Sequence, residues 1–456
     1  MALQPKPHIA DIQPVTHGGI NFCVTAGGEE RIAAPFGLAM TRVTKDGPAM
    51  KGLKGADSGE ERIAAPFGLA MTRVKKDGPA MTGLKGADSD EERIAAPFGL
   101  AMTRVKGARK RAHLKERPYI RTDCIDILDF STCCNPYGPP PSVSKALAKA
   151  NIALYPDPDC REFINLLSDK IGAAKENLIA TNGSTELLRL AALAYTGHGD
   201  TVVIPSPTYG EYELASQIAA ATVAKYQMKE RAGFRFAAGD FISFAQKHSP
   251  AAIFICNPNN PTGQYLGFSD IRKIVSSFPD TLVVLDEAYV SFTLDAWDSL
   301  ELLHYPNILI VRSMTKDFAL AGLRLGYGIA SREIINILKK IRPPWNVNSA
   351  AQQAGIAALN SPGHLKKCNA LINKGKDYLI AQLGSLGYRV LPTDANFSLV
   401  RVGKAATFQS RLLDRGFLVR DCSSFGLPAY IRIAPRRMQD CLKLIAAIKS
   451  VRGEVK

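Results

Sequence analysis

Four short apolar runs, each followed at once by a polar loop, constrain the fold of this chain more than any other feature. The runs cover residues 178–180, 251–256, 281–285 and 307–311. Short runs that are apolar throughout are typical of strands buried on both faces of a parallel sheet. The carboxyl ends of such strands share one edge of an open α/β sheet, and ligands bind at that edge. We therefore expect an α/β fold in which the four loops meet at one site.

The loop after the fourth run carries a lysine near two hydroxyls. Its sequence is Ser313-Met314-Thr315-Lys316, and Arg324 follows eight residues after the lysine. A lysine amine can bind an aldehyde covalently, while a hydroxyl and a guanidinium can grip a phosphate group. The aldehyde cofactor pyridoxal 5′-phosphate needs both.

The loop after the first run suits the same phosphate. Gly183, Ser184 and Thr185 directly precede a helical apolar face over 187–195. Unpaired amides and the helix dipole favour an anion at such a helix N-terminus. A plain capping arrangement is the alternative for this loop taken alone.

The remaining loops supply groups for the cofactor ring. Asp286 would keep the pyridine nitrogen protonated, so that the ring can accept electrons. Asn260 and Tyr289 would hydrogen-bond the ring hydroxyl, and Tyr209 would stack on the ring. Lys316, Asp286 and Tyr209 are the predicted catalytic residues. Each has an ordinary structural interpretation alone, such as a turn, a helix cap or a core aromatic, but their order along the chain favours a cofactor site.

From about Asp126 to about Ser450, the chain resembles the fold-type-I pyridoxal-phosphate enzymes of the class I/II aminotransferase family. It is most similar there to the branch that holds histidinol-phosphate aminotransferases and threonine-phosphate decarboxylases. This resemblance implies a large domain with a mainly parallel seven-stranded sheet and a smaller α/β domain. It makes Lys316 the Schiff-base lysine. Tyr155 resembles the tyrosine that reaches across a dimer interface to the partner's cofactor phosphate, which implies a homodimer with shared active sites.

The same resemblance implies substrate contacts. Arg432 looks like the arginine that clamps the substrate's α-carboxylate. Arg436 lies four residues further on. It either helps to bind a substrate phosphate or belongs to a solvated basic pair, and both interpretations are open. His17, in a His-Gly-Gly element, and Asn135 complete the predicted substrate contacts.

Motifs at residues 17–21, 343–348 and 420–425 are similar to the decarboxylase side of the branch. We therefore expect a carboxy-lyase of cobalamin biosynthesis that converts L-threonine O-3-phosphate to (R)-1-amino-2-propanol O-2-phosphate. The alternative is a histidinol-phosphate aminotransferase of histidine biosynthesis that uses 2-oxoglutarate and glutamate. Cys133 departs from the decarboxylase pattern, which usually has asparagine there, and a thiol is a poor hydrogen-bond donor. A cofactor-binding protein without turnover is disfavoured, because Lys316, Asp286 and Arg432 are all intact.

An internal repeat precedes this region. Near-identical copies begin at Glu29, Glu60 and Glu91, 31 residues apart. Too few large apolar residues are present for a stacked solenoid, so an inserted, flexible segment is the prediction, with a protein-binding or anionic-surface module as the alternative. The expected organisation is an N-terminal arm (1–28), inserted repeats (29–121), a small domain (122–155 and 344–456) and a large cofactor domain (156–343).

Charge and cysteine content limit the remaining possibilities. The formal net charge is +15, but the basic patch at 106–111 has no interleaved aromatics, so no nucleic-acid partner is expected. Nine cysteines lack metal-ligand spacing, so no metal is expected, and they fit reduced thiols of a cytoplasmic protein. No run reaches membrane-spanning length, and the N-terminus lacks a signal peptide's apolar core.

Overall fold

The computed structural model describes residues 22–24, 30–32 and 127–453. The first two segments are short strands, β1 (Phe22–Val24) and β2 (Glu30–Ile32), which pair antiparallel. The predicted arm, the repeats and His17 otherwise lie outside the described residues. Their predicted roles therefore stay predictions.

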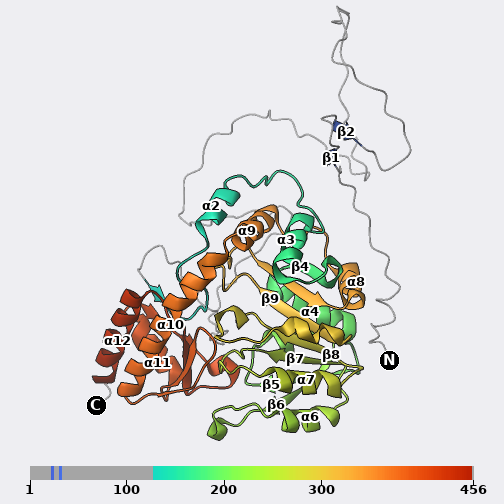
Figure 1. Cartoon of the computed structure of the whole chain (residues 1–456). Helices are drawn as coiled ribbons and strands as arrows, with labels where there is room; N and C mark the ends of the chain where they lie inside the picture. Colours follow the sequence, from blue (N-terminus) through green and yellow to red (C-terminus); the bar gives the residue numbers. More distant parts are fainter. Residues whose placement is uncertain (1–21, 25–29, 33–126, 454–456) are drawn as a thin grey trace, which may run out of the picture. The chain divides into compact units, whose positions relative to one another are not determined.

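A seven-stranded sheet lies at the centre of the larger part of the described chain, between helices (Figure 1). Its order is β4-β10-β9-β8-β7-β5-β6, and every pair from β9 to β6 is parallel. Only β10 runs antiparallel to its neighbours, β9 and β4. The predicted mainly parallel seven-stranded sheet is thus confirmed. The strands are β4 (Leu178–Asn182), β5 (Thr201–Ser206), β6 (Thr222–Gln227), β7 (Ala252–Cys256), β8 (Leu282–Asp286), β9 (Ile308–Ser313) and β10 (Leu325–Ala330).

Both faces of this sheet are buried, which is why the sequence shows unbroken apolar runs. Every residue of β7 and β8 is buried. Along β7, Ile253 and Ile255 enter one core, whereas Phe254 enters the core on the opposite face. The side chains alternate between the faces, as the pleat of a strand requires. The four predicted strands are confirmed, with their ends shifted by one or two residues.

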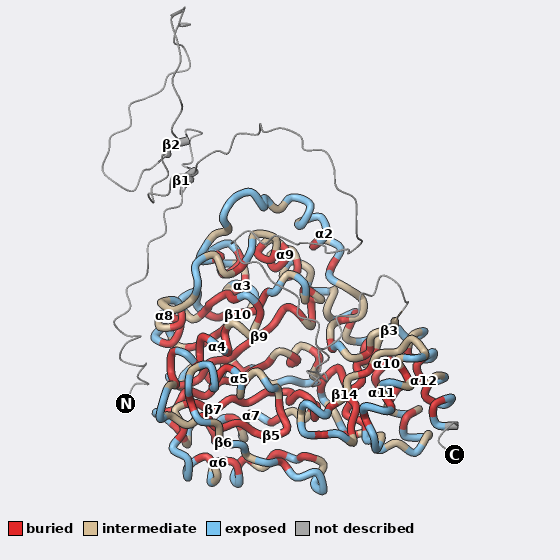
Figure 2. The backbone as a smooth tube through the Cα atoms, turned by 180° about the vertical axis from the view of Figure 1, so that it is seen from behind, coloured by how far each residue is buried: buried red, intermediate tan, exposed pale blue. Residues whose placement is uncertain are grey.

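Helices cover the two faces (Figures 1 and 2). Side chains of α3, α6, α7 and α9 enter the core with Ile253. Side chains of α4, α5 and α8 enter the core with Phe254. The helices are α2 (Pro141–Leu147), α3 (Arg161–Ile171), α4 (Gly183–Tyr195), α5 (Glu211–Ile218), α6 (Ala238–Gln246), α7 (Phe268–Ser277), α8 (Arg332–Ile341) and α9 (Ser349–Leu359). Short 3₁₀ helices lie between these elements: η1 (Lys175–Asn177), η2 (Glu230–Ala232), η3 (Val290–Phe292) and η4 (Ser299–His304).

A second, smaller sheet has the order β11-β12-β15-β14 and is antiparallel throughout. Its strands are β11 (Arg389–Val390), β12 (Ser398–Arg401), β14 (Arg420–Asp421) and β15 (Tyr430–Ile433). The helices α10 (Pro362–Ser385), α11 (Ala405–Leu413) and α12 (Met438–Gly453) lie beside it, with η5 (Ser423–Phe425) (Figure 1). A two-residue strand from the beginning of the described body, β3 (Leu128–Asp129), pairs parallel with β13 (Phe417–Leu418). This pairing joins the segment before α2 to the carboxyl-terminal part of the chain.

None of the helices among the described residues is long and apolar enough to cross a membrane.

Candidate active site

The predicted site residues gather at one edge of the large sheet. The strands β5, β7, β8 and β9 are parallel, and β4 points the same way because β10 runs antiparallel to both β4 and β9. Their carboxyl ends therefore share one edge. The residues placed there are Gly183, Ser184 and Thr185 after β4, Tyr209 after β5, Asn260 after β7, Asp286 at the end of β8, and Ser313 and Lys316 at and after the end of β9. Arg324 directly precedes the antiparallel β10 and so lies at the same edge.

A cradle of hydrogen-bond donors forms where α4 begins. Gly183 has φ +74°, and a Cβ built there would lie 2.6 Å from Nη2 of Arg324. A Cβ on Gly326 would lie 2.6 Å from the amide nitrogen of Ser184. The turn therefore brings the Arg324 guanidinium and the helix N-terminus together only because both positions are glycine. At the end of β9, the hydroxyls of Ser313 and Thr315 lie 2.7 Å apart. These donors and the helix dipole fit an anion.

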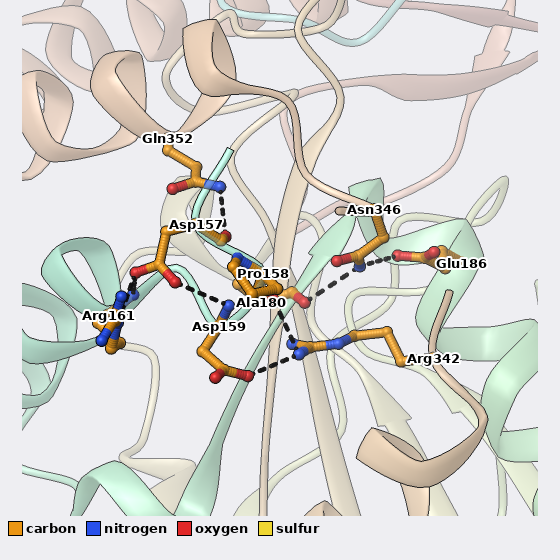
Figure 3. A network of polar contacts seen from close by, with 9 residues as sticks. All are labelled: Asp157, Pro158, Asp159, Arg161, Ala180, Glu186, Arg342, Asn346 and Gln352. Carbon is orange, nitrogen blue, oxygen red and sulfur yellow. Dashed lines mark hydrogen bonds and ion pairs between the residues drawn. The ribbon is translucent and has the colours of Figure 1, made fainter. Parts of the chain in front are cut away.

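Side chains from two distant segments support this turn (Figure 3). Glu186 Oε2 accepts hydrogen bonds from the Asn182 amide and from Asn346 Nδ2, each 2.6 Å long. Just beyond α8, Arg342 donates to the Pro158 carbonyl at 2.9 Å. The start of α4 is thus tied to the 342–346 segment, and that segment is tied to the residues before α3.

Asp286 is a buried carboxylate with one side-chain partner that the sequence did not reveal. Tyr212, on α5, donates a 2.8 Å hydrogen bond to Asp286 Oδ2, and the Ala288 amide donates to Oδ1 at 3.0 Å. Burial raises the pKa of Asp286 to about 6, although these donors and nearby Lys316 favour the anion. A cation beside the carboxylate would restore the anion. The protonated ring nitrogen of the cofactor is such a cation, so the site fits pyridoxal phosphate.

Tyr212 lies three residues after Tyr209, in the first turn of α5. The two rings pack edge to face, with centroids 5.6 Å apart. The Tyr209 hydroxyl forms a hydrogen bond with the Thr185 side chain, while burial raises its pKa. Tyr209 therefore links the turn after β4 to the loop after β5.

Lys316 lies beside the segment that contains the paired cysteines. Its Nζ is 4.0 Å from Cys134 Sγ. The Asn135 amide donates to the Lys316 carbonyl at 2.8 Å, and Asn135 Nδ2 donates to the Asp317 carbonyl at 3.0 Å. Asn135 thus anchors the turn that carries the lysine. Its predicted contact with substrate stays a prediction.

Arg432, in β15, reaches from the small sheet to the edge of the large one. Its Nη1 donates to Asn260 Oδ1, and its Nη2 donates to the Ser131 carbonyl at 2.9 Å. The guanidinium lies 5.1 Å from the centroid of the Phe397 ring. Its Nε is buried without a hydrogen-bond partner. Buried donors are normally satisfied, so an acceptor from a ligand would complete this group.

Three further predicted residues have other surroundings. Tyr289 is buried with its ring edge-on to Phe397. Arg436 donates to the Asp129 carbonyl at 3.1 Å and pairs with Asp440, so it is engaged by the chain itself. Tyr155 is 76% exposed and stacks on Trp345 at 4.4 Å. Among the residues described, no group of His, Cys, Asp and Glu is placed to hold a metal ion.

The fold and the site define a fold-type-I pyridoxal-phosphate enzyme. Residues 125–448 match the model of the family "Aminotransferase class I and II", and the chain belongs to this family. Its cofactor is pyridoxal 5′-phosphate. Among solved structures, the histidinol-phosphate aminotransferase from Sinorhizobium meliloti in complex with pyridoxal-5′-phosphate has the same fold, with a TM-score of 0.67 and 24% identity over 72% of this chain and 92% of that one.

The curated relatives separate the two reactions considered above. The histidinol-phosphate aminotransferase of Moorella thermoacetica is 36% identical over 343 residues, which cover 72% of this chain and 86% of the relative. That of Methanococcoides burtonii is 39% identical over 296 residues, which cover 64% of this chain and 80% of the relative. The L-threonine-O-3-phosphate decarboxylase from Porphyromonas gingivalis is a structural neighbour with 28% identity and a TM-score of 0.64, covering 72% of this chain and all of that one.

The prediction of a threonine-phosphate decarboxylase is therefore wrong. The relatives that are 36% and 39% identical to this chain are aminotransferases, whereas the decarboxylase is a structural neighbour with 28% sequence identity. The physical reason is that both enzymes need the same groups to hold the cofactor. Short motifs around those groups do not determine which bond to the substrate carbon breaks.

Proposed function

We propose that this protein is a histidinol-phosphate aminotransferase. The observation that carries the proposal is the similarity to curated aminotransferases over at least four-fifths of their own length. The reaction transfers the amino group of L-histidinol phosphate to 2-oxoglutarate, giving 3-(imidazol-4-yl)-2-oxopropyl phosphate and L-glutamate. No carbon–carbon bond breaks, and the two substrates exchange an amino group for a keto oxygen.

When bound, the cofactor supplies an electron-accepting ring and a carrier for the amino group. Lys316 takes the proton from the amino-bearing carbon of histidinol phosphate and later delivers a proton to the α-carbon of glutamate. Asp286, held by Tyr212, keeps a proton on the ring nitrogen. Gly183, Ser184, Thr185, Ser313 and Arg324 bind the phosphate of the cofactor.

Arg432 must accept two different anions in this reaction. Glutamate has an α-carboxylate on its amino-bearing carbon, whereas histidinol phosphate has a phosphate ester one carbon away. A guanidinium presents planar, paired donors that fit both groups. The unpartnered Nε of Arg432 is the donor left for this purpose.

We also propose a homodimer with shared active sites. Tyr155 and its neighbours Ile152 and Leu154 are exposed to 76%, 86% and 62%. Exposed apolar side chains in a row favour a protein contact. Tyr155 would then reach the cofactor phosphate of the second subunit. We also propose a small domain (122–155 and 344–456) and a large cofactor domain (156–343), although α2 and α9 of the former pack into a core of the large sheet. We further propose a cytoplasmic location, which the free thiols of the described cysteines support.

The test is a steady-state assay of the full chain loaded with pyridoxal phosphate. L-histidinol phosphate with 2-oxoglutarate should yield glutamate and the keto phosphate in equal amounts. The variant Lys316→Ala should lose at least about a thousandfold in kcat, because it lacks the amine that moves the proton. Absence of glutamate with the wild-type enzyme would reject the proposed substrate pair.

A further inference from the structure

The residue directly after the catalytic lysine is a buried carboxylate without a role in the chemistry above. Asp317 is 8% exposed. Its Oδ2 accepts a 2.8 Å hydrogen bond from Ser291 Oγ, and its Oδ1 accepts a 2.8 Å hydrogen bond from the Phe318 amide. Both carboxylate oxygens therefore act as acceptors. Burying an ionisable group destabilises a fold unless specific partners compensate, so the position calls for an explanation.

Three segments hold the turn that contains Asp317. Asn135, ahead of α2, donates to the carbonyls of Lys316 and Asp317. Ser291 belongs to η3, which begins four residues after Asp286. The carbonyl of Ser291 in turn accepts a hydrogen bond from Nδ2 of Asn369, on α10. Ser291 thus connects Asp317, in the lysine turn, to α10, the helix beside the small sheet.

The charges around Asp317 are few. Burial raises the pKa of Asp317 to about 6, and the Arg312 guanidinium favours its anion. The Tyr327 hydroxyl also feels the carboxylate, and burial raises the pKa of Tyr327. Arg312 is itself paired with Glu287 at 3.0 Å. On the side of the lysine, the titratable groups are Asp286, Cys133 and Cys134.

We propose that Asp317 is a positioning residue for Lys316: its carboxylate fixes the lysine turn against η3 and so sets where the amine stands relative to Asp286. The proposal rests on the role of Lys316 in the proposed function. The backbone of Lys316 and Asp317 is fixed by Asn135, and the Asp317 side chain prevents rotation of the turn about that anchor. Small displacements of a proton-transfer group reduce rate strongly, which gives the clamp a catalytic consequence.

The substitution Asp317→Asn tests this directly, because an amide has one acceptor oxygen where two are used. Its oxygen can still accept from the Phe318 amide, but its NH₂ group then donates to the Ser291 hydroxyl, so a charge-assisted hydrogen bond becomes a weaker neutral one of reversed direction. We expect kcat to fall by at least about tenfold while the KM values change less than about twofold. The visible absorbance of the lysine-bound cofactor changes with pH as the imine nitrogen gains or loses a proton. Because a nearby negative charge favours the protonated form, its removal should lower the midpoint of this titration by at least about half a pH unit.

Ser291→Ala is the second variant, since it removes one donor and leaves the buried carboxyl in place. It should reduce kcat in the same direction, and it decides the question if Asp317→Asn does not fold. Asp280→Asn, an exposed aspartate at the far end of β8, is the matched control and should resemble wild type in kcat and midpoint.

The absorbance titration needs only protein and cofactor, so it remains informative even if histidinol phosphate proves to be the wrong substrate. A folded Asp317→Asn enzyme with the kcat and the midpoint of the Asp280→Asn control would overturn the proposal. If Asp317→Asn, Ser291→Ala and the control all have the kcat and the midpoint of the wild type, Asp317 is a structural residue only.

Discussion

Tyr212 donates a hydrogen bond of 2.8 Å to Asp286, from a helix that packs against the opposite face of the sheet from Ile253. The phenol is fully buried and stacks on Phe254 at 5.6 Å. It is therefore fixed in position, and its O–H favours the anion of Asp286. In the proposed function, this contact keeps a negative charge available for the cofactor nitrogen.

Removing this hydroxyl should weaken cofactor binding. In Tyr212→Phe the anion of Asp286 loses a donor, and hydrogen bonds to charged groups contribute about 1.5–3 kcal/mol. We expect the dissociation constant of pyridoxal phosphate, measured by absorbance titration, to rise about tenfold or more. Tyr226→Phe is the control, because Tyr226, on β6, packs against phenylalanine rings and not against Asp286. Equal dissociation constants for both variants would contradict this role of Tyr212.

The raised pKa of Asp286 predicts a pH-dependent stability of the cofactor-free protein. The carboxyl titrates near pH 6 when folded, against an ordinary value of 3.8. The folded state therefore bears a penalty for the anion that is absent below about pH 4, grows as pH rises to about 6, and is complete above it. Asp286→Asn should remove this penalty. It should stabilise the apoprotein at pH 8 by up to roughly 3 kcal/mol, and by about half as much at pH 5.

Urea unfolding of the apoprotein at the two pH values checks this. Asp280→Asn, which is exposed, should show no such dependence. If Asp286→Asn changed the free energy of unfolding by the same amount at pH 5 and pH 8, burial of the anion would not be the cause.

The glycine at the start of α4 should be irreplaceable. In Gly183→Ala, the new Cβ would meet Arg324 Nη2 at 2.6 Å, and φ is +74°. A left-handed conformation of a non-glycine residue costs about 1–2 kcal/mol, and the arginine must also move out of the phosphate cradle. We expect cofactor affinity to fall by at least about tenfold. Gly210→Ala is a matched control, because no heavy atom lies within 4 Å of the added Cβ and φ is −67°. Similar affinities for the two variants would exclude the cradle.

Arg432 should not tolerate lysine. Lys has a single ammonium, so it cannot contact Asn260 and the Ser131 carbonyl while also offering the donor that Nε holds in reserve. In Arg432→Lys, the KM values for histidinol phosphate and 2-oxoglutarate should both rise by about tenfold or more. Arg272→Lys, on the exposed side of α7, is the control. A rise for only one of the two substrates would show that Arg432 does not bind both anions.

Much of the fold, and the gathering of the predicted site residues at one edge of the sheet, followed from the sequence because the signals are local. Each buried strand is one apolar run, and each loop residue follows its strand by a few positions, so sheet topology brings Asp286 and Lys316 to one edge without knowledge of distant contacts. Tyr212 escaped notice because its partner Asp286 is 74 residues away. Asn135 is predicted to contact substrate, whereas in the structure its side-chain amide donates to the lysine turn, across 182 residues.

The reaction was the part that local motifs could not supply. The groups that are predicted to hold the cofactor, such as Asp286 and Arg324, would serve both reactions equally. The choice between them depends on how the whole pocket orients the bonds at one substrate carbon. Similarity over the full length of the domain carries that information, and it corrected the prediction.

The most direct test of the proposed function is a half-reaction. Enzyme loaded with pyridoxal phosphate is mixed with L-histidinol phosphate alone, and the visible absorbance is followed. The account predicts loss of the band at one equivalent per active site, and its full return on addition of 2-oxoglutarate, with one glutamate formed per site. A band that histidinol phosphate leaves unchanged, or that 2-oxoglutarate fails to restore, would contradict the assignment.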